Sequence, residues 1–185
     1  MNRVAIVLAA GAGRRFGGGK LAAPFRGEPL LAHAIRAACA SPAARVIVVA
    51  APGLDCGDTG RAEVLRLASD SLSASLRAGL EAAGACDGAF VFLGDMPLVP
   101  HGMAARLADA IGPAHAALPR FAGRPGHPVL LSPAAMADAV AHLNGDEGMG
   151  RLLRGRADVA FVESDDPGVC ADVDRPDDLD RLGGG

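Results

Sequence analysis

Hydrophobic positions alternate between two patterns along the chain. Short continuous apolar runs, typical of strands buried on both faces of a sheet, occur at residues 4–8, 46–49, 90–93, 116–118, 129–131 and 159–162. Between them, apolar residues recur every three or four positions, which predicts helices over 29–40, around Leu76, Leu107 and Met136, and after Pro176. This alternation predicts an α/β fold, a Rossmann-like three-layer sandwich with a mostly parallel sheet covered on both faces.

The length and composition limit the class of protein. The 185 residues show no internal repeat or linker, so we expect a single domain over 1–185. The net charge of −3, with no Trp or Tyr, argues against nucleic acid as a partner. The first apolar run is too short for a signal peptide, and none approaches the ~20 residues of a membrane span. We therefore expect no membrane partner and a cytoplasmic location.

The loop after the first predicted strand is rich in glycine and cations. Residues 8–20 read LAAGAGRRFGGGK, with five glycines, two arginines and one lysine. In open α/β sheets ligands bind beyond the carboxyl ends of the strands. Glycines let backbone N–H groups approach an anion, and Arg and Lys bind phosphate oxygens strongly. The glycine spacing fits neither a P-loop nor a dinucleotide fingerprint. A polyphosphate is the predicted ligand, and a flexible surface loop is the alternative.

A carboxylate follows the third predicted strand, within the sequence LGDMP at 93–97. Asp95 is a hard oxygen ligand of the kind that holds Mg²⁺ together with substrate phosphates. The alternative is that Asp95 caps the next helix, but Pro97 and Pro100 move that helix further along the chain. The position therefore favours a metal site.

These two segments together resemble the signature loops of a nucleotidyltransferase family, the MocA/MobA-like enzymes that include the molybdenum cofactor cytidylyltransferases and their guanylyltransferase relatives. The resemblance implies a fold like that of the nucleotide-diphospho-sugar transferases and a Mg²⁺-dependent transfer reaction. Ala10 stands where the guanylyl branch has glycine, which associates the chain with CTP. The implied acceptor is molybdopterin, and the implied protein partner is a molybdoenzyme or its maturation chaperone.

The same resemblance assigns roles to individual residues. It gives Arg15, Lys20 and Asp95 catalytic roles, the first two on the triphosphate and the third on the metal. The residues it places at the nucleotide are Leu8, Ala9, Ala10, Gly11, Gly13, Arg15, Lys20, Ser73 and Ser75. The segment at 71–80 also fits the start of a helix capped by Ser71 or Ser73, and both readings stay open.

Weaker similarities concern the metal and the acceptor. Asp174, in DVDRPDD at 172–178, resembles a second metal ligand, although acids and Pro also favour a helix start. His127, Pro128 and Asp146 resemble acceptor contacts. A structural role for the histidine is an even alternative, as is Asp146 capping a short helix through Leu153.

The sequence thus predicts transfer of CMP from CTP to the phosphate of molybdopterin, with release of pyrophosphate. The nearest alternative is a guanylyltransferase relative or a transferase with another phosphorylated acceptor. A non-catalytic module that binds and delivers a nucleotide or cofactor is an alternative of another class, and a nucleotide-sugar synthase is disfavoured because such chains are usually longer.

Overall fold

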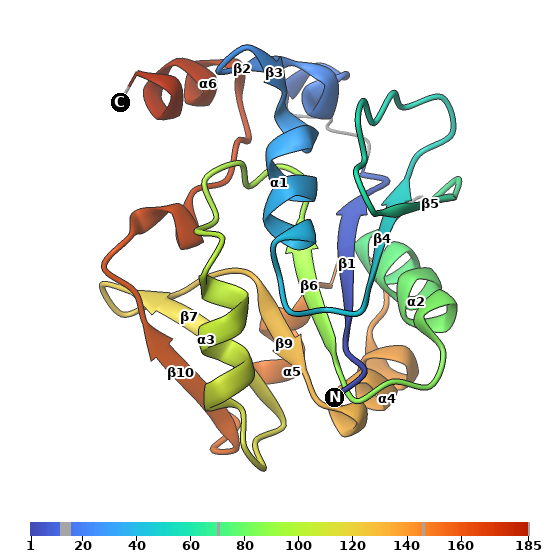
Figure 1. Ribbon diagram of the computed structural model, residues 1–185, viewed down its shortest axis with the longest axis vertical. Helices are drawn as coiled ribbons and strands as arrows, with labels where there is room; N and C mark the ends of the chain where they lie inside the picture. The colour runs from blue at the N-terminus through green and yellow to red at the C-terminus, as the bar shows by residue number, and fades with distance from the viewer. Residues whose placement is uncertain (12–15, 70, 146, 185) are drawn as a thin grey trace.

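An eight-stranded sheet runs through the middle of the molecule (Figure 1). The computed structural model describes residues 1–11, 16–69, 71–145 and 147–184. The strand order is β10-β7-β9-β6-β1-β4-β5, with β8 paired to β7. The strands are β1 (Val4–Ala9), β4 (Arg45–Ala50), β5 (Glu63–Arg66), β6 (Ala89–Leu93), β7 (Ala116–Phe121), β8 (Arg124–Pro125), β9 (Val129–Leu131) and β10 (Val159–Glu163). A separate hairpin joins β2 (Pro24–Phe25) to β3 (Glu28–Pro29).

Helices cover both faces of this sheet. The α-helices are α1 (Leu30–Cys39), α2 (Leu72–Ala83), α3 (Met103–Ala110), α4 (Pro133–His142), α5 (Met149–Leu153) and α6 (Pro176–Gly183), with short 3₁₀ segments η2 (Lys20–Ala22) and η3 (Pro167–Cys170). In Figure 1, α1 and α3 lie in front of the sheet, and α2, α4 and α5 lie behind it. The predicted α/β fold with a large, mostly parallel sheet is therefore confirmed.

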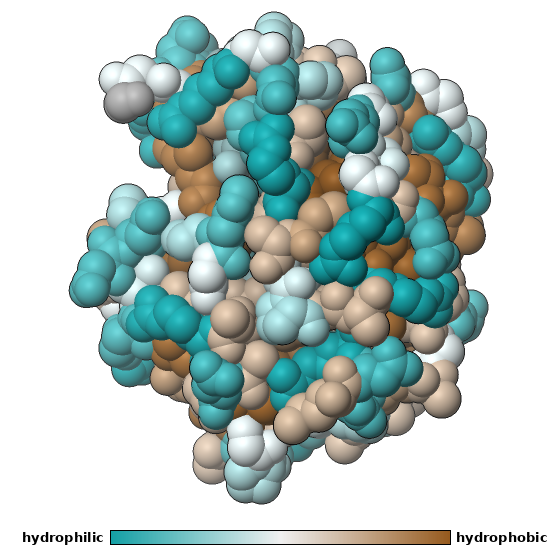
Figure 2. Space-filling model, viewed as in Figure 1, coloured by the Kyte–Doolittle hydropathy of each residue, from teal (hydrophilic) through white to brown (hydrophobic). Residues whose placement is uncertain are grey.

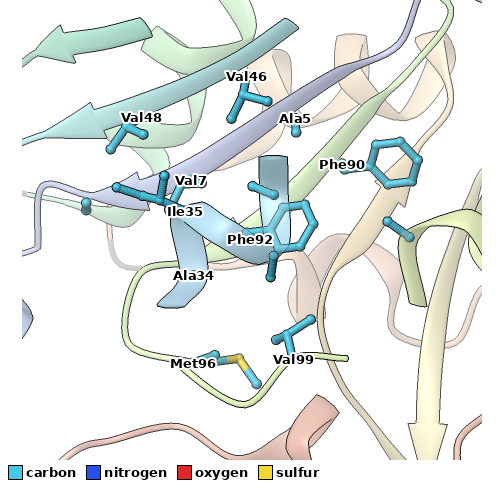
Figure 3. Close-up of a cluster of buried hydrophobic side chains, with 14 of the residues drawn as sticks. Ala5, Val7, Ala34, Ile35, Val46, Val48, Phe90, Phe92, Met96 and Val99 are labelled. Atoms are coloured by element: carbon cyan, nitrogen blue, oxygen red, sulfur yellow. The ribbon is translucent and has the colours of Figure 1, made fainter. Parts of the chain in front are cut away.

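Alternation along the strands divides the core between the two faces. Val7 of β1 and Phe92 of β6 point to the α1 side, where they meet Ala34 and Ile35 (Figure 3). Ile6 and Val91, their neighbours in sequence, point to the α2 side. All six residues of β1 are buried, as the continuous apolar run predicts. The parallel register of β1 with β6, in which Leu8 lies opposite Leu93, places the carboxyl ends of the two strands side by side.

β9 runs against its neighbours. It pairs antiparallel with both β6 and β7, whereas β1, β4, β5 and β6 pair in parallel. Between β7 and β9 the chain has only 122–128, which is too short for the helical crossover that a parallel pair needs. Val129 lies opposite Val91, so the residues that precede β9 reach the same edge as the residues that follow β6.

Several short elements depart from the expected pattern. The edge strand β5 has only two apolar residues, Val64 and Leu65, and is largely exposed, so no apolar run in the sequence predicts it. Each strand of the β2–β3 hairpin has two residues. Arg26, at the turn of this hairpin, donates a hydrogen bond to the Leu182 carbonyl of α6. The predicted short helix through Leu153 is present as α5.

The surface of the α1 side mixes hydrophilic and hydrophobic residues (Figure 2). Hydrophobic residues come to the surface in a recess between α6 and the part of the molecule that carries η3 and α3. No helix within the described parts of the chain is long and apolar enough to span a bilayer.

Candidate active site

Three charged side chains meet beyond the carboxyl ends of β1 and β6. The Lys20 Nζ lies 2.6 Å from Asp95 Oδ2 and 3.8 Å from Asp174 Oδ1, and it donates a 2.7 Å hydrogen bond to the Val173 carbonyl. The Lys20 side chain is only 12% exposed, whereas that of Asp174 is 44% exposed. Residues predicted separately from three distant segments therefore share one site.

Close backbone contacts hold this site together. The Gly94 N–H donates to the Leu8 carbonyl at 3.0 Å, and a Cβ on Gly94 would lie 3.0 Å from that oxygen and from Leu31 Cδ1. Any larger residue at position 94 would crowd Leu8 and Leu31, so glycine favours this close approach of β6 to β1. The Val173 N–H donates to the Asp95 carbonyl at 3.0 Å, and the Val173 side chain is fully buried. The segment before α6 is thus attached directly to the loop that carries Asp95.

The first turn of α6 fixes the backbone of Asp174. The Asp178 carboxylate accepts hydrogen bonds from the N–H groups of Asp174 and Arg175, and from the Arg181 guanidinium. The Arg181 hydrogen bond, followed by the two backbone donors, lowers the pKa of Asp178 to about 2. The role of Asp178 is therefore structural: its negative charge stabilises the N-terminus of α6.

The glycine-rich loop leads into a small cavity. Gly17, Gly18 and Gly19 have φ values of 88°, 97° and 65°, a left-handed backbone region that side chains disfavour. Beyond them, a cavity of about 200 Å³ is lined by Ala9, Gly11, Gly19, Lys20, Leu21, Ala51 and Leu54. The structure thus brings predicted nucleotide residues from β1 and from the loop to the same cavity. Leu8 and Ala10, the sequence neighbours of the cavity residue Ala9, are buried.

Ser73 and Ser75 lie in the first turn of α2, and both are buried. The Ser73 N–H donates to the Gly145 carbonyl at 3.1 Å. The Ser75 hydroxyl lies within hydrogen-bond distance of Ser69 Oγ and of the Ser71 carbonyl, and Ser71 caps the helix by accepting from the Ala74 N–H. The capping role therefore falls to Ser71, and a nucleotide contact of Ser73 or Ser75 stays a prediction.

His127 reaches the site because β9 is reversed. Its N–H donates to the Val169 carbonyl at 2.8 Å, and its Nδ1 lies 3.5 Å from the Val91 carbonyl. A Cβ on the preceding Gly126 would lie 2.2 Å from the Val169 oxygen, so this turn admits only glycine. Burial lowers the pKa of His127, against the hydrogen bond to Val91 and the charges of Asp95 and Asp172, which raise it. Pro128, which follows through a cis peptide bond, is buried.

A groove of about 480 Å³ begins at His127 and extends over the α5 side of β7 and β10. Its walls are mainly apolar and include Leu118, Met149, Leu153 and Phe161. At its rim Arg156 pairs with Asp158 at 2.8 Å, whereas Arg154 has no hydrogen-bond or ion-pair partner within the described parts of the chain. The groove has a size that suits a small molecule.

The predicted site and the observed site do not contain the same residues. Gly13, Arg15 and Asp146 lie outside the described residues. Sequence reasoning missed the Val173 carbonyl and the groove residues Gly150 and Arg154. The one available signal for Val173 was its position as an apolar residue between the two acids Asp172 and Asp174, which favours an anchored segment.

The chemistry of the three charged groups fits a divalent cation. Within the described residues no three His, Cys, Asp or Glu side chains gather as a complete metal site. Asp95 and Asp174 nevertheless share one cation, the Lys20 ammonium, in a partly buried place. Mg²⁺ typically uses one or two carboxylates and takes its other ligands from substrate phosphates and water. The two aspartates match that requirement.

A sheet with a glycine-rich loop after β1 and an acid after β6 defines a nucleotide-binding α/β enzyme class. The MobA-like NTP transferase domain family matches residues 5–161, so the chain belongs to this family and is a nucleotidyltransferase. The matched segment contains Lys20 and Asp95 but ends before Asp174. No curated protein matches the sequence.

Solved structures agree with this assignment. An Rv0371c homologue from Mycobacterium sp. strain JC1 is 28% identical, with a TM-score of 0.87 over 98% of this chain and 95% of its own. Rv0371c of Mycobacterium tuberculosis, in complex with manganese, is 26% identical, with a TM-score of 0.84 over the whole of both chains. The Mth528 nucleotidyl transferase of Methanothermobacter shares the fold at 22% identity and a TM-score of 0.81, covering 99% of this chain and 96% of its own.

Proposed function

We propose that the protein transfers CMP from CTP to the phosphate of molybdopterin. The observation that carries the proposal is the meeting of Lys20, Asp95 and Asp174 beside the cavity that the glycine-rich loop borders. Ala10 at the end of β1 supports CTP over GTP through the family pattern. Molybdopterin is supported by the same pattern, and a molybdoenzyme or its maturation chaperone is the partner that such a product needs.

The reaction requires little covalent chemistry from the protein. An oxygen of the acceptor phosphate attacks the α-phosphorus of CTP in line with the leaving group. The bond from that phosphorus to the oxygen bridging the α- and β-phosphates breaks, and pyrophosphate leaves with the electron pair. Catalysis then depends on positioning and on neutralising charge.

The chain's own residues divide this work. Lys20 carries a positive charge to the triphosphate, and Arg15 is assigned the same role by the family pattern. Asp95 and Asp174 would hold Mg²⁺, which supplies further positive charge to the phosphates when it is bound. The manganese complex of Rv0371c supports a divalent cation in this family. The short connection from Gly94 to Leu8 keeps Asp95 beside the glycine-rich loop.

The groove that starts at His127 is the proposed place for the body of the acceptor. His127 lines one end of the groove, in the turn before β9 at the same sheet edge as the loop that carries Asp95. At the rim of the groove, the Arg154 guanidinium could bind an anionic group of the acceptor that lies away from the reacting phosphate. His127 lines this groove, which supports its predicted contact with the acceptor. Contacts of Pro128 and Asp146 with the acceptor stay predictions from the family pattern.

A two-stage experiment tests the proposal. The first stage measures the melting temperature with CTP, GTP, ATP or UTP, each with and without Mg²⁺, since a ligand of the native state raises stability in proportion to RT ln(1 + [L]/Kd). The second measures pyrophosphate release from CTP with molybdopterin as acceptor. A Mg²⁺-dependent shift with CTP and pyrophosphate release are expected. A preference for GTP assigns the chain to the guanylyl branch. Nucleotide binding without pyrophosphate release overturns molybdopterin as the acceptor and leaves a transferase with another phosphorylated acceptor or a delivery module.

A further inference from the structure

The Lys20 ammonium lies where a divalent cation on Asp95 would have to bind. It is 2.6 Å from Asp95 Oδ2 and 3.8 Å from Asp174 Oδ1. A Mg²⁺ ion bound to the same carboxylate oxygen would sit about 2.1 Å from it. Two cations cannot share that oxygen at such distances without strong repulsion, because the site is partly buried and weakly screened. A divalent cation at Asp95 Oδ2 therefore competes directly with Lys20, and one at the other carboxylate oxygen is still repelled by the nearby ammonium.

The structure shows what holds Lys20 in place and what would release it. Besides the two carboxylates, the Lys20 ammonium contacts the Val173 carbonyl, which accepts a 2.7 Å hydrogen bond from it. Val173 is 153 residues away in the sequence. On its other side, the chain enters Lys20 through Gly17, Gly18 and Gly19, where an added Cβ would meet nothing within 4 Å. The ammonium is thus bound at its tip, while the glycines before Lys20 are exposed to solvent. A triphosphate in the adjoining cavity offers the ammonium new anionic partners.

We propose that Lys20 is a tethered cation that occupies the metal position until a nucleotide draws it away. In the nucleotide-free protein Lys20 balances Asp95 and Asp174 and competes with divalent cations. When the phosphates of a nucleotide bind Lys20, the two carboxylates become available to the metal. Metal and nucleotide affinities are then linked through one side chain, and the linkage is reciprocal. This regulation rests on the proposed function only in taking a nucleoside triphosphate as the ligand.

The test measures Mn²⁺ binding by calorimetry and by electron paramagnetic resonance, without an acceptor and therefore without turnover. Lys20→Met removes the charge and keeps much of the side-chain length, and Lys20→Gln is a second neutral variant in case the first is unstable. Lys20→Arg is the matched control that keeps the charge. In the absence of nucleotide, we expect both neutral variants to bind Mn²⁺ about tenfold more tightly than the wild type or Lys20→Arg.

Two further measurements separate competition at this site from a general loss of positive charge. Arg26→Met removes an exposed cation from the β2–β3 turn and should leave Mn²⁺ affinity unchanged. Adding Asp95→Asn to Lys20→Met should abolish the gain. In addition, CTP should increase Mn²⁺ affinity by a larger factor in the wild type than in Lys20→Met, because only the wild type has a competing cation to displace.

The outcomes distinguish this proposal from the proposed function. Equal or weaker Mn²⁺ binding by both neutral variants overturns the tethered-cation role, even if the enzyme transfers CMP normally. Tighter binding by these variants, together with no CMP transfer to molybdopterin, supports the role of Lys20 and overturns the assigned reaction. A gain that persists after Asp95→Asn shows that the metal binds elsewhere and also overturns the proposal.

Discussion

The two halves of the active-site edge are built in different ways. On the nucleotide side, β1 and β6 are parallel neighbours, and the functional residues lie in the loops that follow them. On the acceptor side, β9 is antiparallel, and His127 lies in the turn that precedes it. Both turns reach the same edge because reversing a strand exchanges its ends. One half of the site thus follows the rule for parallel sheets, whereas the other depends on a reversal that the rule does not describe.

This difference separates local from long-range construction. The glycine-rich loop and Asp95 each follow a buried strand directly, so short sequence segments determine their positions. On the acceptor side, His127 is instead held by the Val169 carbonyl, a contact between distant segments. Lys20 is the exception on the nucleotide side, because its tip is held by the distant Val173 carbonyl. The nucleotide half should therefore respond to changes in single motif residues, and the acceptor half to changes in shape and packing.

The largest expected effect is on the nucleotide side. Asp95→Asn removes the carboxylate that pairs with Lys20 and is assigned to the metal, so kcat for CMP transfer should fall at least ~100-fold at saturating Mg²⁺. Asp165→Asn, at an exposed loop position, is the control and should retain wild-type activity. Initial rates of pyrophosphate release measure both variants. Near-normal turnover by Asp95→Asn would contradict the catalytic assignment.

A smaller effect should appear on the acceptor side. Gly150 lines the groove, and an added Cβ there would meet nothing within 4 Å, so a large side chain can enter without a clash at its base. Gly150→Phe should raise the KM for the acceptor about tenfold and leave the Kd for CTP unchanged. Gly150→Ala is the matched control with little added volume. If Gly150→Phe raised the Kd for CTP instead, the two halves would not be separate in function.

The smallest effect concerns stability and pH. Because burial lowers the pKa of His127, the unfolded chain binds a proton at this residue before the folded protein does. The stabilising contribution of neutral His127 is complete above the ordinary histidine pKa of about 6.5 and is lost as the pH falls below it. The slope approaches at most about 1.4 kcal/mol per pH unit for one proton.

Denaturant unfolding between pH 7.5 and 5 measures this contribution. His127→Asn should flatten the pH dependence of the free energy of unfolding, whereas His101→Asn, at an exposed position, should not. Asp95 and Asp172 are the charges that oppose the shift at His127. An unchanged slope in His127→Asn would show that the histidine titrates in the folded protein as it does in the unfolded chain.

The sequence predicts the parts of the fold whose signals are local. Continuous apolar runs predicted six of the strands, β1, β4, β6, β7, β9 and β10, and the glycines and the acid after two of them predicted where the cluster around Lys20 would form. The direction of β9 was not predicted, although the connection 122–128 between β7 and β9 is too short for the helical crossover of a parallel pair. The edge strand β5 was missed because only Leu65 of its four residues packs against the core, so the strand needs no apolar run.

The contacts of side chains were less predictable than their neighbourhood. The family pattern places Lys20 on phosphates, yet in the structure its nearest partners are Asp95 and the Val173 carbonyl. Every residue has a backbone carbonyl, so a sequence motif cannot reveal which carbonyl binds Lys20. The groove was missed for a similar reason, since it is formed by ordinary apolar residues from β7, β10 and α5 that meet only in the folded chain.

The attachment of Val173 to the site matters for anyone who shortens this chain. The matched family domain ends at residue 161, which makes that position a natural place to cut. A protein cut there would keep the glycine-rich loop and Asp95, but it would lose Asp174, the carbonyl that binds Lys20 and the Val169 carbonyl that holds His127. The useful boundary for expression therefore lies beyond α6, and an inactive short version would say nothing about whether the family reaction occurs.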